Sequence, residues 1–132
     1  MARILLVDDE PLILRSMQKT LLRAGYDVDT AATCPEGLQL FMKAQSSDQP
    51  FALAVLDMNM PNFEGQEASG AGLELLGRLL DCQADLPIIM LTAYDETIKA
   101  KEAIRRGARA YCVKGREQNL LDTINSILAS PV

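Results

Sequence analysis

The sequence contains neither histidine nor tryptophan, and its three cysteines are widely separated. The lack of histidine excludes Ser-His-Asp and Cys-His catalysis. It also leaves no Cys/His zinc pattern, and no C-x-x-C pair is present. We therefore expect Cys34, Cys82 and Cys112 to be free thiols in a reducing cytoplasm.

Long apolar runs and an excess of positive charge are also missing. No apolar run approaches the roughly 18 residues that a membrane span needs. The short apolar run at the N-terminus is followed by the acidic triplet Asp8, Asp9 and Glu10, which is a poor signal-peptide pattern. The net charge is -5 and the pI about 4.7, which argues against non-specific nucleic-acid binding. We expect a cytoplasmic protein with no membrane or nucleic-acid partner.

The rest of the composition is typical of a globular domain. The chain has 132 residues, of which 48% are apolar and 23% charged, so it is long enough to bury a sizeable core. No internal repeat, linker or low-complexity tract divides it. We therefore expect a single domain over residues 1–132.

The most informative stretch is 51–61, which reads FALAVLDMNMP. Residues 51–56 carry no polar side chain, as is typical of a strand covered on both faces in a parallel sheet. Pro61 cannot continue a central strand, so the strand is expected to end within a few residues of Asp57. The Asp57 carboxylate is thereby placed at the carboxyl end of a buried strand, where open α/β sheets bind ligands.

Apolar runs and helical spacing predict five strands that alternate with five helices. The strands are expected at 4–7, 26–32, 51–57, 87–91 and 109–113, and the helices at 11–24, 34–44, 73–80, 95–106 and 117–129. Apolar residues at helical spacing, among them Leu12, Met42, Ile98 and Ile104, are expected on the inner faces of these helices. The alternation implies a doubly wound α/β fold, with a parallel sheet and helices on both faces.

Four of the five predicted strands end in polar or charged residues, namely Asp8 and Asp9, Asp57, Thr92, and Lys114. In a parallel sheet all carboxyl ends lie at one edge, so these side chains converge. One such residue alone is usually an ordinary solvated side chain. The agreement of four strand ends favours a site instead.

Three converging carboxylates repel one another, and a divalent cation relieves that repulsion. All-oxygen ligands suit Mg²⁺. A carboxylate beside Mg²⁺ can act as a nucleophile and form an aspartyl phosphate. Lys114 can neutralise phosphoryl oxygens, and Thr92 can hydrogen-bond one of them.

These residues resemble a known family over essentially the full length of the chain. The segments ILLVDDE at 4–10, LDMNMP at 56–61, LTA at 91–93 and GARAYCVK at 107–114 are similar to those of the receiver domain of two-component response regulators. The resemblance implies a flavodoxin-like (βα)5 fold with strand order 2-1-3-4-5. It also implies a signalling domain, not an enzyme with its own substrate, which takes a phosphoryl group from a histidine kinase in the presence of Mg²⁺.

The resemblance assigns roles to the residues around the metal. Asp57 matches the phosphoacceptor and is also a metal ligand. Asp9 matches the direct Mg²⁺ ligand and Asp8 the residue that holds the ion through water. The backbone carbonyl of Asn59 is implied as the third protein ligand.

The resemblance assigns further roles to three residues at the ends of the last two strands. Thr92 and Lys114 are implied to contact the phosphoryl oxygens. Thr92 and the aromatic Tyr111 match the positions of the family's conformational switch. Tyr111 also has an ordinary interpretation as a half-buried strand tyrosine, which the switch role does not exclude.

The chain departs from the family pattern at three places. Gly115 follows Lys114 where the family usually has a cis-proline, and we expect a trans peptide bond there. The family commonly reads MPxxxGxELL after the aspartate, whereas here QEASGAG, residues 66–72, precedes LELL. This predicts an extended loop at about 62–72, either a partner-contact loop or a tolerated insertion. Bulky Tyr94 is expected to hinder the hydrolytic water, giving a phosphoryl lifetime on the order of hours.

Two other functions remain open on the residues alone. A Mg²⁺-dependent phosphatase with an aspartyl intermediate is one, although Asn59 stands where such enzymes have a second carboxylate. A flavin mononucleotide carrier is the other, although the carboxylates oppose an anionic phosphate and tryptophan, a common ring partner, is absent.

The expected partners are a sensor histidine kinase or phosphotransfer protein, and an output domain or partner protein. The chain is either a stand-alone regulator or the receiver portion of a longer one. A homodimer through the fourth helix, fifth strand and fifth helix is a further expectation, with Arg105, Arg106 and Arg109 bridging to acidic groups.

Overall fold

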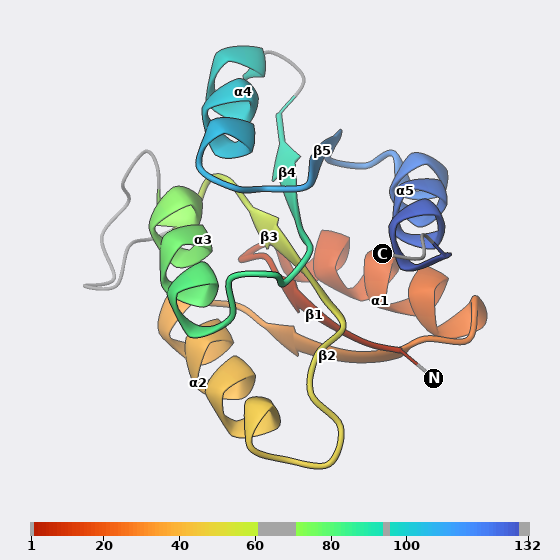
Figure 1. The fold of residues 1–132 in the computed structure, drawn as a ribbon. Helices are drawn as coiled ribbons and strands as arrows, with labels where there is room; N and C mark the ends of the chain where they lie inside the picture. The colour runs from red at the N-terminus through yellow and green to blue at the C-terminus, as the bar shows by residue number, and fades with distance from the viewer. Residues whose placement is uncertain (1, 61–70, 94–95, 130–132) are drawn as a thin grey trace.

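The computed structural model describes residues 2–60, 71–93 and 96–129. Five parallel strands form one sheet in the order β2-β1-β3-β4-β5 (Figure 1). The strands are β1 (Arg3–Val7), β2 (Asp27–Ala31), β3 (Leu53–Asp57), β4 (Ile88–Thr92) and β5 (Ala110–Val113). The predicted flavodoxin-like fold and its strand order are confirmed.

Five helices cover the two faces of the sheet. They are α1 (Pro11–Arg23), α2 (Cys34–Gln45), α3 (Ala71–Cys82), α4 (Thr97–Arg105) and α5 (Glu117–Ala129). Helices α1 and α5 pack on one face, and α2, α3 and α4 on the other (Figure 1). This is the doubly wound arrangement expected from strands that alternate with helices.

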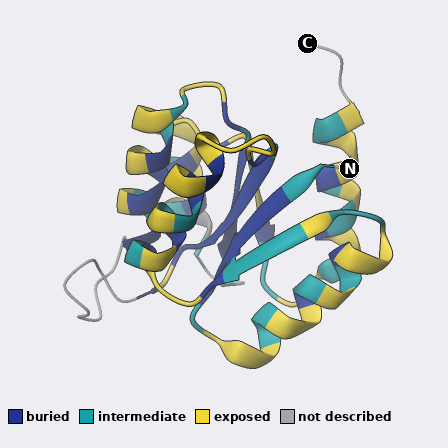
Figure 2. Ribbon diagram, turned by 90° about the horizontal axis from the view of Figure 1, so that it is seen from below, coloured by how far each residue is buried: buried dark blue, intermediate teal, exposed yellow. Residues whose placement is uncertain are grey.

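The core lies in two layers because successive strand residues point to opposite faces of the sheet. In β1, Ile4 and Leu6 join the layer under α1 and α5, whereas Leu5 and Val7 join the layer under α2 and α3. All four side chains are fully buried, and each contributes about 1.5–3 kcal/mol of burial free energy. Figure 2 shows the buried strands between helices that are exposed on their outer sides.

The inner faces of the helices differ in part from the prediction. Ile98 is 82% exposed and Leu12 77% exposed, and Met42 and Ile104 are also exposed. In α4, Ala100 and Ala103 are fully buried, so these small side chains pack inward while the isoleucines turn outward. Periodicity alone does not decide which row of a short helix faces the sheet.

The helix after the predicted loop begins earlier than expected. Ala71 and Gly72 are the first residues of α3, two positions before the predicted start at Leu73. The rest of the predicted loop, residues 62–70, lies outside the described residues. None of the described helices is long and apolar enough to cross a membrane.

Candidate functional site

The polar strand ends meet at the carboxyl edge of the sheet, as predicted. Asp8 follows β1, Asp57 ends β3 and Thr92 ends β4, and all three are buried with at most 2% exposure. Lys114 follows β5. The register pairs Asp57 with Leu91, which places the end of β3 directly beside the end of β4.

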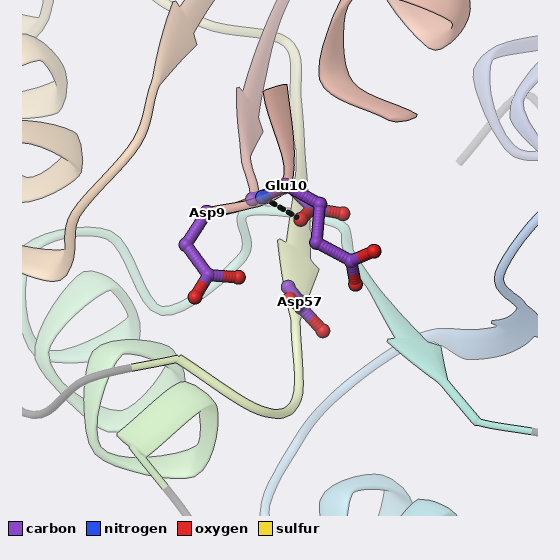
Figure 3. A group of neighbouring side chains, drawn as sticks. Asp9, Glu10 and Asp57 are labelled. Atoms are coloured by element: carbon purple, nitrogen blue, oxygen red, sulfur yellow. Dashed lines mark hydrogen bonds between the residues drawn. The ribbon is translucent and has the colours of Figure 1, made fainter. Parts of the chain in front are cut away.

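Four acidic side chains form one cluster at this edge. Asp8, Asp9, Glu10 and Asp57 each offer a carboxylate oxygen, and these oxygens all lie within 4.8 Å of one another. Figure 3 shows Asp9 and Glu10, on the loop after β1, beside Asp57 at the end of β3. Glu10 was not predicted as a site residue, although it directly follows the two predicted aspartates.

Lys114 provides the positive charge of the cluster. Its Nζ lies 3.1 Å from Asp57 Oδ2 and 3.3 Å from the Asp8 carboxylate, and it also contacts Glu10 Oε1. The lysine side chain is only 15% exposed, so water screens these ion pairs weakly. One ammonium group therefore forms ion pairs with three carboxylates.

Burial and neighbouring charges shift the pKa values of Asp57, Asp8 and Lys114. Burial, together with the nearby Asp8 carboxylate, raises the pKa of Asp57 to about 7 against the opposing effect of Lys114. Burial also raises the pKa of Asp8. The Lys114 pKa is raised because Glu10, Asp57 and Asp8 outweigh the effect of burial, which lowers it. The lysine thus stays charged, and one more cation would stabilise the ionised carboxylates.

Backbone amides orient the two buried aspartates. Asp8 Oδ1 accepts a hydrogen bond from Glu10 N at 2.9 Å, and Asp57 Oδ1 accepts one from Asn59 N at 3.2 Å. Asp8 Oδ2 is buried and receives no hydrogen bond within the described residues. Lys114 Nζ lies 3.3 Å from this oxygen as an ion-pair partner. A buried carboxylate oxygen that receives no hydrogen bond, in a cluster of four acidic side chains, fits a hard divalent cation such as Mg²⁺.

Thr92 and Tyr111 lie on neighbouring strands but in different surroundings. Thr92 is buried, and its carbonyl accepts a hydrogen bond from Lys114 N at 2.9 Å. Tyr111, on β5, is 40% exposed. Tyr94 and its predicted effect on hydrolysis lie outside the described residues.

A further acidic residue, Glu96, ties the loop after Asp57 to α4. Glu96 accepts hydrogen bonds from the side-chain amide of Asn59 and from Ala93 N, the latter at 3.3 Å, and pairs with Lys99 at 2.9 Å. The hydrogen bond from Lys99 lowers the pKa of Glu96. Glu96 thus joins three segments, and sequence reasoning did not single it out.

The loop after Lys114 carries the expected trans geometry. No cis peptide bond occurs among the described residues, and Gly115 has a φ of +90°. That left-handed backbone is one that proline cannot adopt. Lys114 nevertheless contacts Asp57. The loop with glycine at position 115 therefore has a backbone that proline would not allow, and it still places the lysine at the acidic cluster.

Comparison with known proteins identifies the family. The family model for the response regulator receiver domain matches residues 4–125. The chain belongs to the response regulator receiver family. As a receiver domain it is a signalling module of two-component systems, and this outcome confirms the resemblance seen in the sequence.

Curated relatives of this receiver are much longer proteins. Two-component response regulator ORR24 of Oryza sativa subsp. indica is 36% identical over 92% of the chain, which spans 18% of that protein. Response regulator protein FleR of Pseudomonas aeruginosa is 31% identical over 93% of the chain, which spans 24% of that protein. The chain therefore spans less than a quarter of these relatives.

Solved receiver structures superpose closely on this one. A receiver domain protein from Clostridium thermocellum has a TM-score of 0.83 at 29% identity, covering 98% of this chain and 95% of that one. Response regulator TrrA from Thermotoga maritima, solved in complex with Mg²⁺ and BeF, has a TM-score of 0.76 at 33% identity, covering 97% of this chain and 99% of that one.

Proposed function

We propose that this receiver accepts a phosphoryl group on Asp57 from a sensor histidine kinase or phosphotransfer protein, in a Mg²⁺-dependent reaction. The observation that carries the proposal is a fully buried aspartate that contacts Lys114 within a cluster of three further acidic side chains. Few structural roles call for a buried carboxylate with so much negative charge around it.

Asp57 is the nucleophile of the proposed transfer. One of its carboxylate oxygens attacks the phosphorus, the phosphorus–nitrogen bond to the donor histidine breaks, and the released nitrogen recovers a proton from solvent. Lys114 Nζ, already 3.1 Å from Asp57 Oδ2, neutralises charge on the transferred group. Thr92, buried at the end of β4, supplies a hydroxyl to one phosphoryl oxygen.

The acidic cluster fits Mg²⁺ by its chemistry. Asp9 and Asp57 would hold the ion directly, together with the Asn59 carbonyl, and Asp8 would hold it through water. The Asp8 oxygen that receives no hydrogen bond within the described residues supports this assignment, as does the Mg²⁺ named for the structure of TrrA. When bound, the ion supplies positive charge that offsets the repulsion among the carboxylates and the phosphoryl oxygens.

The proposed output is a shift between two conformations. Thr92 and Tyr111 are the proposed switch residues, and α4, β5 and α5 form the surface that changes. That surface would control an output domain or a partner protein, or form a homodimer. We place this signalling in the cytoplasm and treat residues 1–132 as one receiver domain.

Intact-mass spectrometry after incubation with phosphoramidate tests the phosphotransfer directly. We expect one added phosphoryl group with Mg²⁺, none with EDTA, and none in Asp57→Asn. Asp81→Asn, in the last turn of α3, is the matched control and should be phosphorylated like the wild type. A phosphoryl group that appears equally in EDTA, or in Asp57→Asn, would contradict the proposal.

A further inference from the structure

The first turn of α3 approaches the backbone of the phosphoacceptor more closely than a side chain would permit. The Gly72 amide donates a hydrogen bond to the Met58 carbonyl at 3.2 Å. A Cβ atom added to Gly72 would lie 2.3 Å from the Asp57 carbonyl oxygen and 2.8 Å from Met58 Cα. Both atoms belong to the main chain, so neither can rotate away. Only glycine allows this contact.

The backbone that Gly72 touches carries the proposed chemistry. Asp57 bears the phosphoacceptor carboxylate, and Asn59, two residues on, bears the carbonyl proposed as a metal ligand. On its other side this segment is held by β4, through the hydrogen bond from Met58 N to the Leu91 carbonyl at 2.9 Å. The phosphoacceptor segment is therefore fixed between β4 and Gly72.

The start of α3 is itself anchored. Ala71 and Gly72 are buried, and the fully buried Cys34 at the start of α2 directs its thiol to the Ala71 carbonyl at 3.8 Å. Gly72 is thus held from the side of α2 while it contacts β3. A shift of the α3 first turn would be transmitted to the segment after Asp57.

The contact also locates the extra residues of this chain relative to the family pattern MPxxxGxELL. Two glycines could correspond to the glycine of that pattern. Gly65 has the pattern's spacing from Pro61, and Gly72 is followed by LELL. Ten residues, 62–71, separate Pro61 from Gly72, where the pattern has three. The steric requirement at Gly72 assigns the pattern's glycine to it, with the extra residues before it in the chain.

We propose that Gly72 is a positioning residue for the metal and phosphoryl site. By letting α3 pack directly on the Asp57 and Met58 backbone, it sets the distance between the Asp57 carboxylate and the Asn59 carbonyl. This inference rests on the proposed function of Asp57. It concerns a residue that touches neither the ion nor the phosphoryl group.

Gly72→Ala tests the proposal, with two control variants in the same helix. Gly77→Ala adds the same methyl group where nothing lies within 4 Å. Leu79→Ala removes a fully buried side chain and lowers stability without touching the site. Magnesium affinity is measured by isothermal titration calorimetry well below each melting temperature, and phosphoryl uptake from phosphoramidate by intact mass.

We expect Gly72→Ala to weaken Mg²⁺ binding about tenfold or more, the loss typical of a displaced supporting contact, and to slow phosphoryl uptake. Gly77→Ala should bind Mg²⁺ and take up phosphoryl groups like the wild type. Leu79→Ala should melt at a lower temperature with Mg²⁺ affinity within about twofold of the wild type. Gly72→Ala within about twofold of the wild type on both readouts, or an equal loss in Leu79→Ala, would overturn the proposal.

The same data separate this inference from the proposed function. If the wild type binds Mg²⁺ and is phosphorylated while Gly72→Ala matches it, only the Gly72 inference fails. If the wild type binds Mg²⁺ without phosphorylation, the proposed function fails and the calorimetry alone decides the role of Gly72. If the wild type binds no Mg²⁺, both fail.

Discussion

Two buried aspartates share one lysine at the centre of the site. Asp57 and Asp8 are fully buried, and Lys114 lies within 3.3 Å of both carboxylates. Burial removes the hydration of both carboxylates, and one ammonium group must compensate for this loss at both of them. The ionised carboxylates are therefore only partly stabilised. The site is therefore electrostatically strained without a second cation, and its stability depends on pH.

The first residue-scale prediction concerns that pH dependence. Burial raises the pKa of Asp57 from 3.8 to about 7, so between these pH values the folded protein holds a proton that the unfolded chain releases. Stability contributed by Asp57 is consequently lost as the pH rises towards 7. In EDTA, the free energy of unfolding of the wild type should fall by about 2 kcal/mol more than that of Asp57→Asn between about pH 5.5 and about pH 8.

Urea unfolding at the two pH values measures this difference. Because Asp8 and Lys114 interact directly with Asp57, the comparison reports the pH dependence that the Asp57 carboxylate adds to the whole coupled group. Parallel pH profiles for the wild type and Asp57→Asn would show that Asp57 is not the strained group.

The second residue-scale prediction concerns Lys114. Lys114→Met keeps the aliphatic chain but removes the charge, which leaves Asp8 and Asp57 buried without a counter-ion. We expect the free energy of unfolding in EDTA to fall by about 3 kcal/mol, and phosphoryl uptake to slow about tenfold or more. Lys101→Met, at an exposed position on α4, should change stability by less than about 0.5 kcal/mol. Equal stability of the two variants would contradict the role given to Lys114.

At the scale of elements, the loop between β5 and α5 depends on a glycine where the family usually has proline. Gly115 has a φ of +90°, and an added Cβ would meet nothing within 4 Å. Gly115→Ala therefore isolates backbone strain from steric contact, and should lower the free energy of unfolding by about 1 kcal/mol. Gly77→Ala, in the middle of α3 and also in open space, should raise it by about 0.5–1 kcal/mol. Chemical denaturation distinguishes the two, and a stabilising Gly115→Ala would refute the assigned backbone conformation.

The junction between β4 and α4 is held by Glu96. Glu96→Ala removes the acceptor for Asn59 and Ala93 and the partner of Lys99. We expect faster amide hydrogen exchange at Ala93 and a loss of about 1 kcal/mol in stability. Glu102→Ala, whose ion pairs are with Arg105 and Arg106 at the C-terminal end of α4, is the control and should leave exchange at Ala93 unchanged. Unchanged exchange in Glu96→Ala would mean that Glu96 does not hold this junction.

The strands could be predicted closely, and the orientation of some helices could not. Four of the strands are apolar runs that stop at a polar residue or a turn, a local signal that residues 4–7 and 51–57 display clearly, whereas β2 alternates polar and apolar residues. In α4, by contrast, Ala100 and Ala103 pack inward while Ile98 points to solvent. Alanine and isoleucine are both apolar, so the sequence does not show which of them faces the sheet. The packing of α4 on the sheet decides this orientation.

The sequence predicted those site residues that lie at or directly after the end of a strand. Asp57 and Lys114 meet because parallel strands share a carboxyl edge. Glu10, Glu96 and Gly72 act through contacts between loops and helix starts, for which the sequence carries no comparable rule. The family pattern marks a glycine before LELL, but the role of Gly72 depends on its distance to the Asp57 and Met58 main chain, which only the structure gives.

At the scale of the whole molecule, an apolar side chain is exposed on the surface proposed to signal. Ile98 on α4 is 82% exposed, and Tyr111 on the neighbouring β5 is 40% exposed. We expect phosphorylation to promote a dimer through this surface and Ile98→Asp to prevent it, because a charge cannot be buried there without a partner. Leu12→Asp, 77% exposed on α1 on the other face of the sheet, should dimerise like the wild type.

Sedimentation velocity with Mg²⁺ and phosphoramidate reads out this assembly. A wild type that stays monomeric when phosphorylated, or an Ile98→Asp variant that dimerises like the wild type, would contradict the proposed surface. Neither result would affect the phosphoacceptor assignment, which rests on the carboxyl edge of the sheet.

The most direct test of that assignment is to locate the phosphoryl group on the chain. Loss of phosphorylation in Asp57→Asn alone also fits a collapsed site, whereas borohydride reduction of the phosphorylated wild type converts the acyl phosphate to homoserine at the modified residue. Peptide mass spectrometry should find homoserine at position 57 only, and only when Mg²⁺ was present. Homoserine at Asp8 or Asp9 instead, or at no aspartate, would contradict the account.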